Sequence, residues 1–238
     1  SYRLRIEINR DNLLSESFSA IMVKRPRDLR KKLWIKFRGE EGIDQGGVAR
    51  EWLHLVSQQV FDPKMKLFKY SSDNNYRLRI NCDSNQCDFH LSYFHFVGRI
   101  IGMAIFHNIQ LAGSFTVAFY KQLINKTLSL HDLRDADPEM YRSLQWILKH
   151  NITDNITATF SVESYRNGAV NVQELKPGGA KISVTEANKR EYVKLYVNYY
   201  FKNGVEHQFS KLQMGFNEIV PLTYLNSFNE RELELLIN

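Results

Sequence analysis

Cysteine is scarce in this chain of 238 residues. Cys82 and Cys87 are the only two, and they lie in a polar stretch with His90 nearby. Two thiols and one imidazole leave a zinc site one ligand short and with the wrong spacing. A disulfide is not expected in a reducing compartment. The sequence therefore predicts no metal, no other cofactor and no disulfide.

Long apolar runs are also missing. No run reaches the roughly 18 residues that a membrane span requires, and the chain opens without a signal-peptide pattern. Hydrophobic residues make up 43% of the chain and charged residues 24%, a composition typical of globular rather than disordered proteins. We therefore expect a cytoplasmic or nuclear protein without a membrane span, large enough for one large domain or two modest ones.

Acidic residues are too few to balance the basic ones, and the formal net charge of +6 raises the question of nucleic-acid binding. One basic run stands out, with Lys24, Arg25, Arg27, Arg30, Lys31 and Lys32. Aromatic stacking residues are not interleaved with them. Pro26 at a favoured first helical position, with Leu29 and Leu33 turned inward, indicates the solvated face of a short helix. We predict no nucleic-acid partner.

Glycine and acidic residues gather in one segment, FRGEEGIDQGGVAREW at residues 37–52. The preceding Lys32–Phe37 alternates apolar and charged residues, which indicates a half-buried strand. Beyond the glycines, apolar residues recur at steps of three and four, as in a helix with one buried stripe: Val48, Trp52, Leu55, Val56 and Val60. A phosphate-binding loop is rejected, because its lysine and glycine pattern is absent and the carboxylates would repel phosphate. The segment predicts a tight strand-to-helix corner.

Other periodic segments extend the first part of the chain. Residues 2–8 alternate as a strand with Leu4, Ile6 and Ile8 on one face, and Asp11 or Asn12 is expected to cap the next helix. Short strands are expected at residues 67–70 and 77–80, and a helix at 113–123. The helix over about residues 88–106 is apolar on nearly every side, which places it at the centre of the core.

A self-contained pattern follows over residues 134–208. It comprises a helix begun by Asp137 and Pro138, strands at 156–162 and 169–174, a Pro-Gly-Gly turn, and a helix capped by Thr185. The chain then returns with amphipathic helices at 205–220 and 229–237. We predict an α+β, predominantly helical protein, with residues 1–133 and 209–238 in a large part and residues 134–208 in a small inserted part.

Six motifs occur in order along the chain: FRGEEGIDQGGVAREW at 37–52, HLSYFHFVGRIIGMA at 90–104, ELKP at 174–177, VTEANKREY at 184–192, GFNEI at 215–219 and ELELLI at 232–237. In order and spacing they resemble the HECT family of ubiquitin ligases, in the Smurf-like branch of WW-domain ligases. The resemblance covers essentially the whole chain. It implies the amino-terminal lobe, or N-lobe, of a HECT domain, with a large helical subdomain and a small subdomain that binds a ubiquitin-conjugating enzyme.

Ligases of this family carry ubiquitin as a thioester on a cysteine in a Thr-Cys-Phe motif, within a separate lobe that follows this region. That motif is absent here, and Cys82 and Cys87 do not match the nucleophile. The resemblance therefore implies a HECT-type ubiquitin transferase whose catalytic residue and carboxy-terminal lobe, or C-lobe, lie outside this chain. Protein substrates would be selected by other domains. The alternative is a non-catalytic, ligase-like scaffold that binds conjugating enzyme or ubiquitin.

Two helical stripes in the small part allow two interpretations. Met140, Leu144 and Ile147 share one helix face, and Tyr192 and Tyr196 share another, so the stripes could simply pack together as core. The resemblance implies instead a groove for an apolar side chain of the conjugating enzyme. The matching positions are Met140, Ser143, Leu144, Ile147, Asp154, Asn155, Ile156, Tyr192 and Tyr196.

The resemblance also implies a second, non-covalent ubiquitin site built from aromatic residues. Tyr70 matches one of its positions. Met65 and Asn167 stand where relatives have aromatic residues. Because the loss of two aromatic anchors weakens an already weak contact, the sequence predicts weak or absent ubiquitin binding there.

Overall fold

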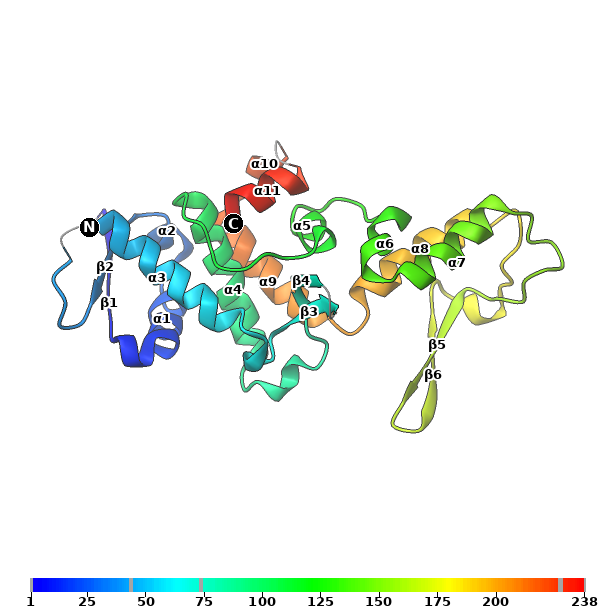
Figure 1. The fold of residues 1–238 in the computed structure, drawn as a ribbon, viewed down its shortest axis with the longest axis horizontal. Helices are drawn as coiled ribbons and strands as arrows, with labels where there is room; N and C mark the ends of the chain where they lie inside the picture. Colours follow the sequence, from blue (N-terminus) through cyan, green and yellow to red (C-terminus); the bar gives the residue numbers. More distant parts are fainter. Residues whose placement is uncertain (1, 43–44, 73–74, 227–228, 238) are drawn as a thin grey trace. The chain divides into compact units, whose positions relative to one another are not determined.

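The computed structural model describes residues 2–42, 45–72, 75–226 and 229–237. Helices predominate, and the strands of the described residues form three two-stranded sheets, so the predicted α+β, mainly helical class is confirmed (Figure 1). The contacts divide the chain into two compact units. Unit 1 comprises residues 1–126 and 204–238, and unit 2 comprises residues 127–203.

Unit 1 begins with a parallel strand pair, β1 (Arg3–Ile8) and β2 (Lys32–Phe37). Alternate residues of both strands are buried, and the register pairs Ile6 with Ile35. The predicted strands and their inward faces are thus confirmed. The connection holds a short 3-10 turn, η1 (Arg10–Asn12), and the helices α1 (Leu13–Met22) and α2 (Pro26–Leu29).

Asn12 is the N-cap residue of α1, one of the two positions predicted, but its side chain makes no capping hydrogen bond. The side chain of Asn9 accepts a hydrogen bond from the backbone N–H of Asp11 at 3.0 Å, and neither predicted residue makes a side-chain cap. The 3-10 turn η1 precedes α1 directly, so the side-chain cap is made one turn earlier than expected, by Asn9 at the start of η1.

The strand-to-helix corner leads from β2 into α3 (Gln45–Val60), as predicted; Ile43 and Asp44 lie outside the described residues. Gly39 has φ of +82°, a conformation that residues with a Cβ rarely adopt. Trp52 is fully buried, and its indole N–H donates to Ser17 Oγ at 2.9 Å. This contact anchors α3 to α1.

The centre of unit 1 is α4 (His90–Phe106), which packs along α9 (Glu206–Ile219). Its burial confirms the predicted central position, but it begins after residue 88, since Phe89 has left-handed backbone with φ of 59°. Glycine allows the close approach. A Cβ on Gly98 would lie 1.9 Å from the carbonyl oxygen of Leu212, and one on Gly215 would lie 2.1 Å from that of His95. The two backbones are therefore in direct contact.

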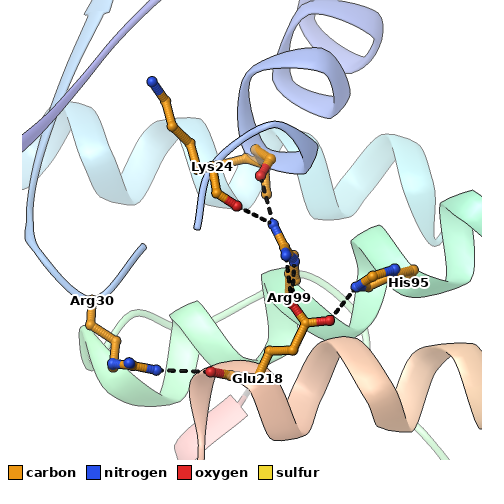
Figure 2. A network of polar contacts seen from close by, with 6 residues as sticks. Lys24, Arg30, His95, Arg99 and Glu218 are labelled. Carbon is orange, nitrogen blue, oxygen red and sulfur yellow. Dashed lines mark hydrogen bonds and ion pairs between the residues drawn. The ribbon is translucent and has the colours of Figure 1, made fainter. Parts of the chain in front are cut away.

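A buried arginine joins α1 to this helix pair (Figure 2). Arg99 donates from Nη1 to the carbonyl oxygens of Ile21 and Lys24, both at 2.9 Å, and from Nε to Glu218 at 3.0 Å. Glu218 also contacts Nε2 of His95 at 2.5 Å. Arg99 thereby donates to one carbonyl group in the last turn of α1, that of Ile21, and to that of Lys24 just beyond it; the Ile21 carbonyl oxygen also accepts from the N–H of Lys24 at 3.2 Å.

The remaining elements of unit 1 cover this centre. A 3-10 turn at Pro63–Met65 precedes the hairpin of β3 (Phe68–Ser72) and β4 (Asn75–Ile80), and a second turn, η3 (Ser84–Gln86), follows it. Helix α5 (Val117–Leu123) starts later than predicted, because Thr116 accepts from the N–H of Phe119 and caps it there. The chain closes with α10 (Leu222–Leu225) and α11 (Glu230–Ile237). Among the described helices, none is both long and apolar enough to cross a membrane.

Unit 2 contains η4 (Leu130–Asp132), α6 (Leu133–Ala136), α7 (Pro138–Lys149), η5 (Gly179–Lys181) and α8 (Lys189–Lys202). Its hairpin, β5 (Ser161–Arg166) and β6 (Ala169–Glu174), extends away from α7 and α8 (Figure 1). Asp137 accepts from the N–H of Met140 at 3.0 Å, which confirms the predicted start of α7.

Two predictions in unit 2 are wrong. The strand expected at residues 156–162 begins only at Ser161, because Phe160 is buried and its N–H bonds instead to the carbonyl oxygen of Ile182 at 3.0 Å. The helix expected after Thr185 begins at Lys189. Asn188 Oδ1 accepts from the N–H of Thr185 at 2.7 Å. Residues 185–188 therefore form a turn closed by this side chain, and the helix begins only after it.

Candidate functional site

The first wall of the predicted groove is α7. Leu144 lies at the centre of its apolar stripe and is 2% exposed, so it is a core residue of unit 2. Met140 and Ile147, on either side of it in sequence, are half-buried, and Ser143 is exposed. The stripe therefore holds unit 2 together through Leu144 and offers apolar surface along one flank, where Met140 and Ile147 lie about 20° apart around the helix.

The second wall is an aromatic series along α8, which packs against α7. Tyr192 is 9% exposed, and its ring meets Phe160 edge-on at 5.6 Å between centroids. Tyr196 is half-buried and lies 6.2 Å from both Tyr192 and Tyr199, measured between centroids. Burial raises the pKa of Tyr192 and raises that of Tyr196 to about 12, so both phenols stay protonated at neutral pH. Each can present a hydroxyl donor beside an apolar ring.

A loop with exposed polar residues follows α7. Asp154 adopts left-handed backbone with φ of 63°, Asp154 and Asn155 are exposed, and Ile156 is half-buried. Left-handed backbone is accessible to aspartate and asparagine more readily than to most residues. All nine residues predicted for the conjugating-enzyme site thus belong to unit 2, on α7, on α8 and on this loop.

An ion pair holds the loop near α8. Lys189 is 5% exposed, and its Nζ lies 2.6 Å from Glu186 Oε1 and 2.8 Å from the carbonyl oxygen of His150. The other oxygen of Glu186 accepts from the N–H of Ile152 at 3.0 Å. Sequence analysis did not single out this clamp. Its only local signal is a glutamate three residues before a lysine, which is common on helix surfaces.

Two further aromatic residues of unit 2 were missed. Trp146 is 43% exposed, and its ring stacks on His150 at 4.7 Å between centroids. Tyr199 extends the α8 series by one more ring. An exposed tryptophan beside an apolar stripe is a signal that sequence could have supplied, since Trp and Tyr are enriched among residues that dominate interface energies.

The residues predicted for a second ubiquitin site have separate structural roles. Tyr70 is 46% exposed and meets Tyr76, itself 76% exposed, edge-on at 5.4 Å. Met65 packs against the core of unit 1. Asn167 and Gly168 have φ of 52° and 77°, the two-residue hairpin turn that asparagine followed by glycine favours. The geometry of the β5–β6 turn therefore gives a physical reason for asparagine at position 167.

The two cysteines are free thiols, and both are half-buried. Burial, followed by the carboxylate of Asp88, raises the pKa of the Cys87 thiol, which lowers the thiolate fraction that nucleophilic attack requires. His90 is bonded through Nδ1 to Ser84 Oγ at 2.9 Å. In the part of the chain that the structure describes, no three His, Cys, Asp or Glu side chains are grouped to hold a metal ion.

The comparison with known families agrees with this architecture. The HECT-domain (ubiquitin-transferase) family matches residues 54–238, and the chain belongs to that family. Among individual proteins, it is 56% identical over 233 residues to "E3 ubiquitin-protein ligase Smurf1" of Drosophila melanogaster, covering 98% of this chain and 22% of the relative. The resemblance to the Smurf-like branch is thereby confirmed.

Fungal relatives give a similar picture. The chain is 44% identical over 238 residues to "E3 ubiquitin-protein ligase RSP5" of Chaetomium thermophilum, covering 100% of this chain and 29% of the relative. It is 46% identical over 232 residues to "E3 ubiquitin-protein ligase pub1" of Schizosaccharomyces pombe, covering 98% and 30%. The chain thus spans less than a third of the length of these curated relatives.

Proposed function

We propose that this chain is the N-lobe of a HECT-type E3 ubiquitin-protein ligase and that it recruits a ubiquitin-charged conjugating enzyme. In the longer protein, the ubiquitin carbonyl would pass from the cysteine of the conjugating enzyme to a cysteine in a C-lobe. One thioester breaks, another forms, and the conjugating enzyme recovers its thiol. Membership of the HECT family and the names of the relatives support this proposal.

We assign docking of the conjugating enzyme to unit 2 and the scaffold role to unit 1. The sequence predicted a small part at residues 134–208 and a large part at residues 1–133 with 209–238, whereas the two units divide at residues 127–203 and at residues 1–126 with 204–238. The observation that carries the assignment is the partly exposed edge of the α7 stripe, Met140 and Ile147, with the half-buried Tyr196 on the adjoining helix. An apolar face with aromatic neighbours and a polar rim is the composition of a compact binding hot spot.

The test uses Ser143, because its exposure makes substitution harmless to the core. Ser143→Arg places a bulky charge on the proposed contact face. We expect a loss of affinity for the conjugating enzyme of about thirtyfold or more, the equivalent of about 2 kcal/mol. Asn171→Arg is the matched control, since it adds the same side chain at an exposed residue of β6. Binding is measured by calorimetry and stability by thermal melting.

The expected result is weak binding by Ser143→Arg at an unchanged melting temperature, with normal binding by Asn171→Arg. Equal affinity of the two variants would move the docking surface away from α7. Leu144 is not suited to this test. Its 2% exposure means that truncation to alanine opens a cavity, at a cost of about 2–5 kcal/mol of stability, whichever role the surface has.

Three further proposals accompany this function. Ubiquitin binding around Tyr70 is weak or absent, supported by the packing of Met65 into the core and by the turn role of Asn167. Protein substrates are selected by domains of the longer protein outside this chain. The protein acts in the cytoplasm, where conjugating enzymes and their substrates meet.

A further inference from the structure

A concave basic surface lies on unit 1, at the end of the β1–β2 pair beside α2. The concavity has a volume of about 330 Å³, and Arg3, Leu4, Arg5, Lys24, Asp28 and Lys31 line it. Lys32 is the register partner of Arg3, and Arg25 bonds to Asp28. We call these six cations and one carboxylate the basic face: Arg3, Arg5, Lys24, Arg25, Lys31, Lys32 and Asp28.

The single carboxylate of the basic face is already engaged. Asp28 accepts from Arg25 Nε at 3.0 Å and lies 2.8 Å from Lys31 Nζ, and these cations hold its pKa well below the usual range. Among the described residues, no carboxylate lies within ion-pair distance of Lys24 or Lys32. Lys24 and Lys32 therefore give the basic face positive charge that no carboxylate of the described residues pairs with, which is the electrostatic condition for binding an anion.

The backbone that presents Lys24 is fixed. Its carbonyl oxygen accepts from Arg99, while its side chain extends away from that contact (Figure 2). Lys32 is equally well placed, since it opens a strand paired in register with β1. The basic face is thus a preorganised surface of strand and helix termini, and an anion bound there would not have to order a flexible segment first.

Two exposed apolar residues adjoin the basic face in sequence. Tyr2 is 72% exposed and precedes Arg3, whose guanidinium lies 5.3 Å from the tyrosine ring centroid. Val23 is 77% exposed and precedes Lys24. Cations next to exposed aromatic and aliphatic side chains are typical of surfaces that rest on membranes, where lipid phosphates meet the cations and apolar groups enter the interface.

The same residues are less suited to nucleic acid. Arg3 lies 5.3 Å from the ring centroid of Tyr2, and the aromatic residue of the strand pair on this side is Trp34, the register partner of Arg5, whose guanidinium covers the Trp34 ring at 5.3 Å. A base would have to displace one of these contacts in order to stack. The concavity is also compact, with the size of one phosphorylated headgroup rather than the length of a groove that follows a polymer.

We propose that the basic face docks this protein on an anionic membrane surface, with a phosphorylated lipid headgroup in the concavity and Tyr2 and Val23 at the lipid interface. This role is independent of the proposed recruitment of conjugating enzyme, which belongs to unit 2. It would place the N-lobe beside membrane-bound substrates.

The test is cosedimentation of the chain with phosphatidylcholine vesicles that contain a phosphoinositide, compared with phosphatidylcholine alone. Lys24→Gln/Lys32→Gln removes two unpaired cations. Each cation near an anionic membrane contributes about fivefold to the affinity, so we expect the double variant to bind the phosphoinositide vesicles about 25-fold more weakly than the unaltered chain. Lys181→Gln/Lys202→Gln is the matched control, since it removes the same charge from exposed positions of unit 2. It should bind as the unaltered chain does. Thermal melting checks that both variants are folded.

Two further arms identify the ligand. Val23→Ser should weaken vesicle binding without weakening binding of a soluble inositol phosphate, since only the membrane offers an apolar interface. A single-stranded oligonucleotide should compete poorly. Absence of vesicle binding at low salt overturns the proposal. It is also overturned if Val23→Ser binds vesicles normally, which indicates a free phosphate ligand, or if the oligonucleotide binds more tightly than the vesicles.

Discussion

Replacement of Arg99 with glutamine should destabilise unit 1 strongly. Arg99 is 6% exposed and joins α1, α4 and α9 through contacts to Ile21, Lys24 and Glu218. Glutamine is shorter and uncharged, so it cannot reach the two carbonyl oxygens and the carboxylate together. The substitution removes the Arg99 donors from these acceptors in the folded state, where the Ile21 carbonyl oxygen keeps only backbone N–H donors, while the unfolded chain regains water at all of them.

The magnitude follows from the burial of the partners. Removal of one member of a buried ion pair costs about 3–5 kcal/mol. The Glu218 side chain is 21% exposed and keeps its contact with His95, so we expect the lower end, about 3 kcal/mol. At a urea dependence of about 1–3 kcal/mol per M, the unfolding midpoint falls by at least about 1 M.

The assay must report on unit 1 alone. The three tryptophans are Trp34, Trp52 and Trp146, and only Trp146 belongs to unit 2. Fluorescence in a Trp146→Phe background therefore follows unit 1 during urea unfolding. Arg25→Gln is the control, because Arg25 pairs with Asp28 at 61% side-chain exposure and such surface pairs contribute about 0–1 kcal/mol. If Arg99→Gln and Arg25→Gln unfold at the same urea concentration, the network does not join these helices as described.

Two more predictions concern the helix pair and the second ubiquitin site. Gly98→Ala should lower the melting temperature sharply, because its Cβ would lie 1.9 Å from the Leu212 carbonyl oxygen and overpacking costs about 1–3 kcal/mol or more; Ser210→Ala, exposed on α9, should melt as the parent does. Titration of labelled ubiquitin should give no saturation at micromolar concentrations. Saturable binding that disappears in Tyr70→Ala would show that this site is intact.

Local sequence pattern was sufficient wherever one side of an element faces the core. The period-two strands β1 and β2 and the stripe of α3 were predicted because burial of one face imposes that periodicity. The start of α7 was predicted from its capping residues, since Asp137 is the N-cap and Pro138 is the first helical residue. In each case the signal lies in the segment itself, because the spacing of its own apolar or capping residues is enough to indicate the element, even where its packing partners are distant in sequence.

The errors occurred where a distant segment decides the local structure. Phe160 looked like a strand residue, but its N–H bonds to Ile182, and the flanking residues Thr159 and Ser183 form an isolated bridge. The Arg99 network joins residues 78 and 119 positions apart in sequence, which no periodicity indicates. The basic face has the same origin. The run beginning at Lys24 suggested a solvated helix, and only the parallel register adds Arg3 and Arg5 to it.

The depth of the side chains in unit 2 also reconciles the two interpretations of the α7 stripe. On a helix, Met140 and Ile147 lie on the same side of Leu144, at about 40° and 60° from it, so the stripe can present Leu144 inward and this one flank partly outward. Leu144 is buried as packing requires, while Met140 and Ile147 keep exposed surface. Because the central residue fixes α7 against α8, the proposed docking surface is preorganised by the core that it borders. Stability and recruitment are therefore separable only at the edge residues, and Ser143 gives the clearest test.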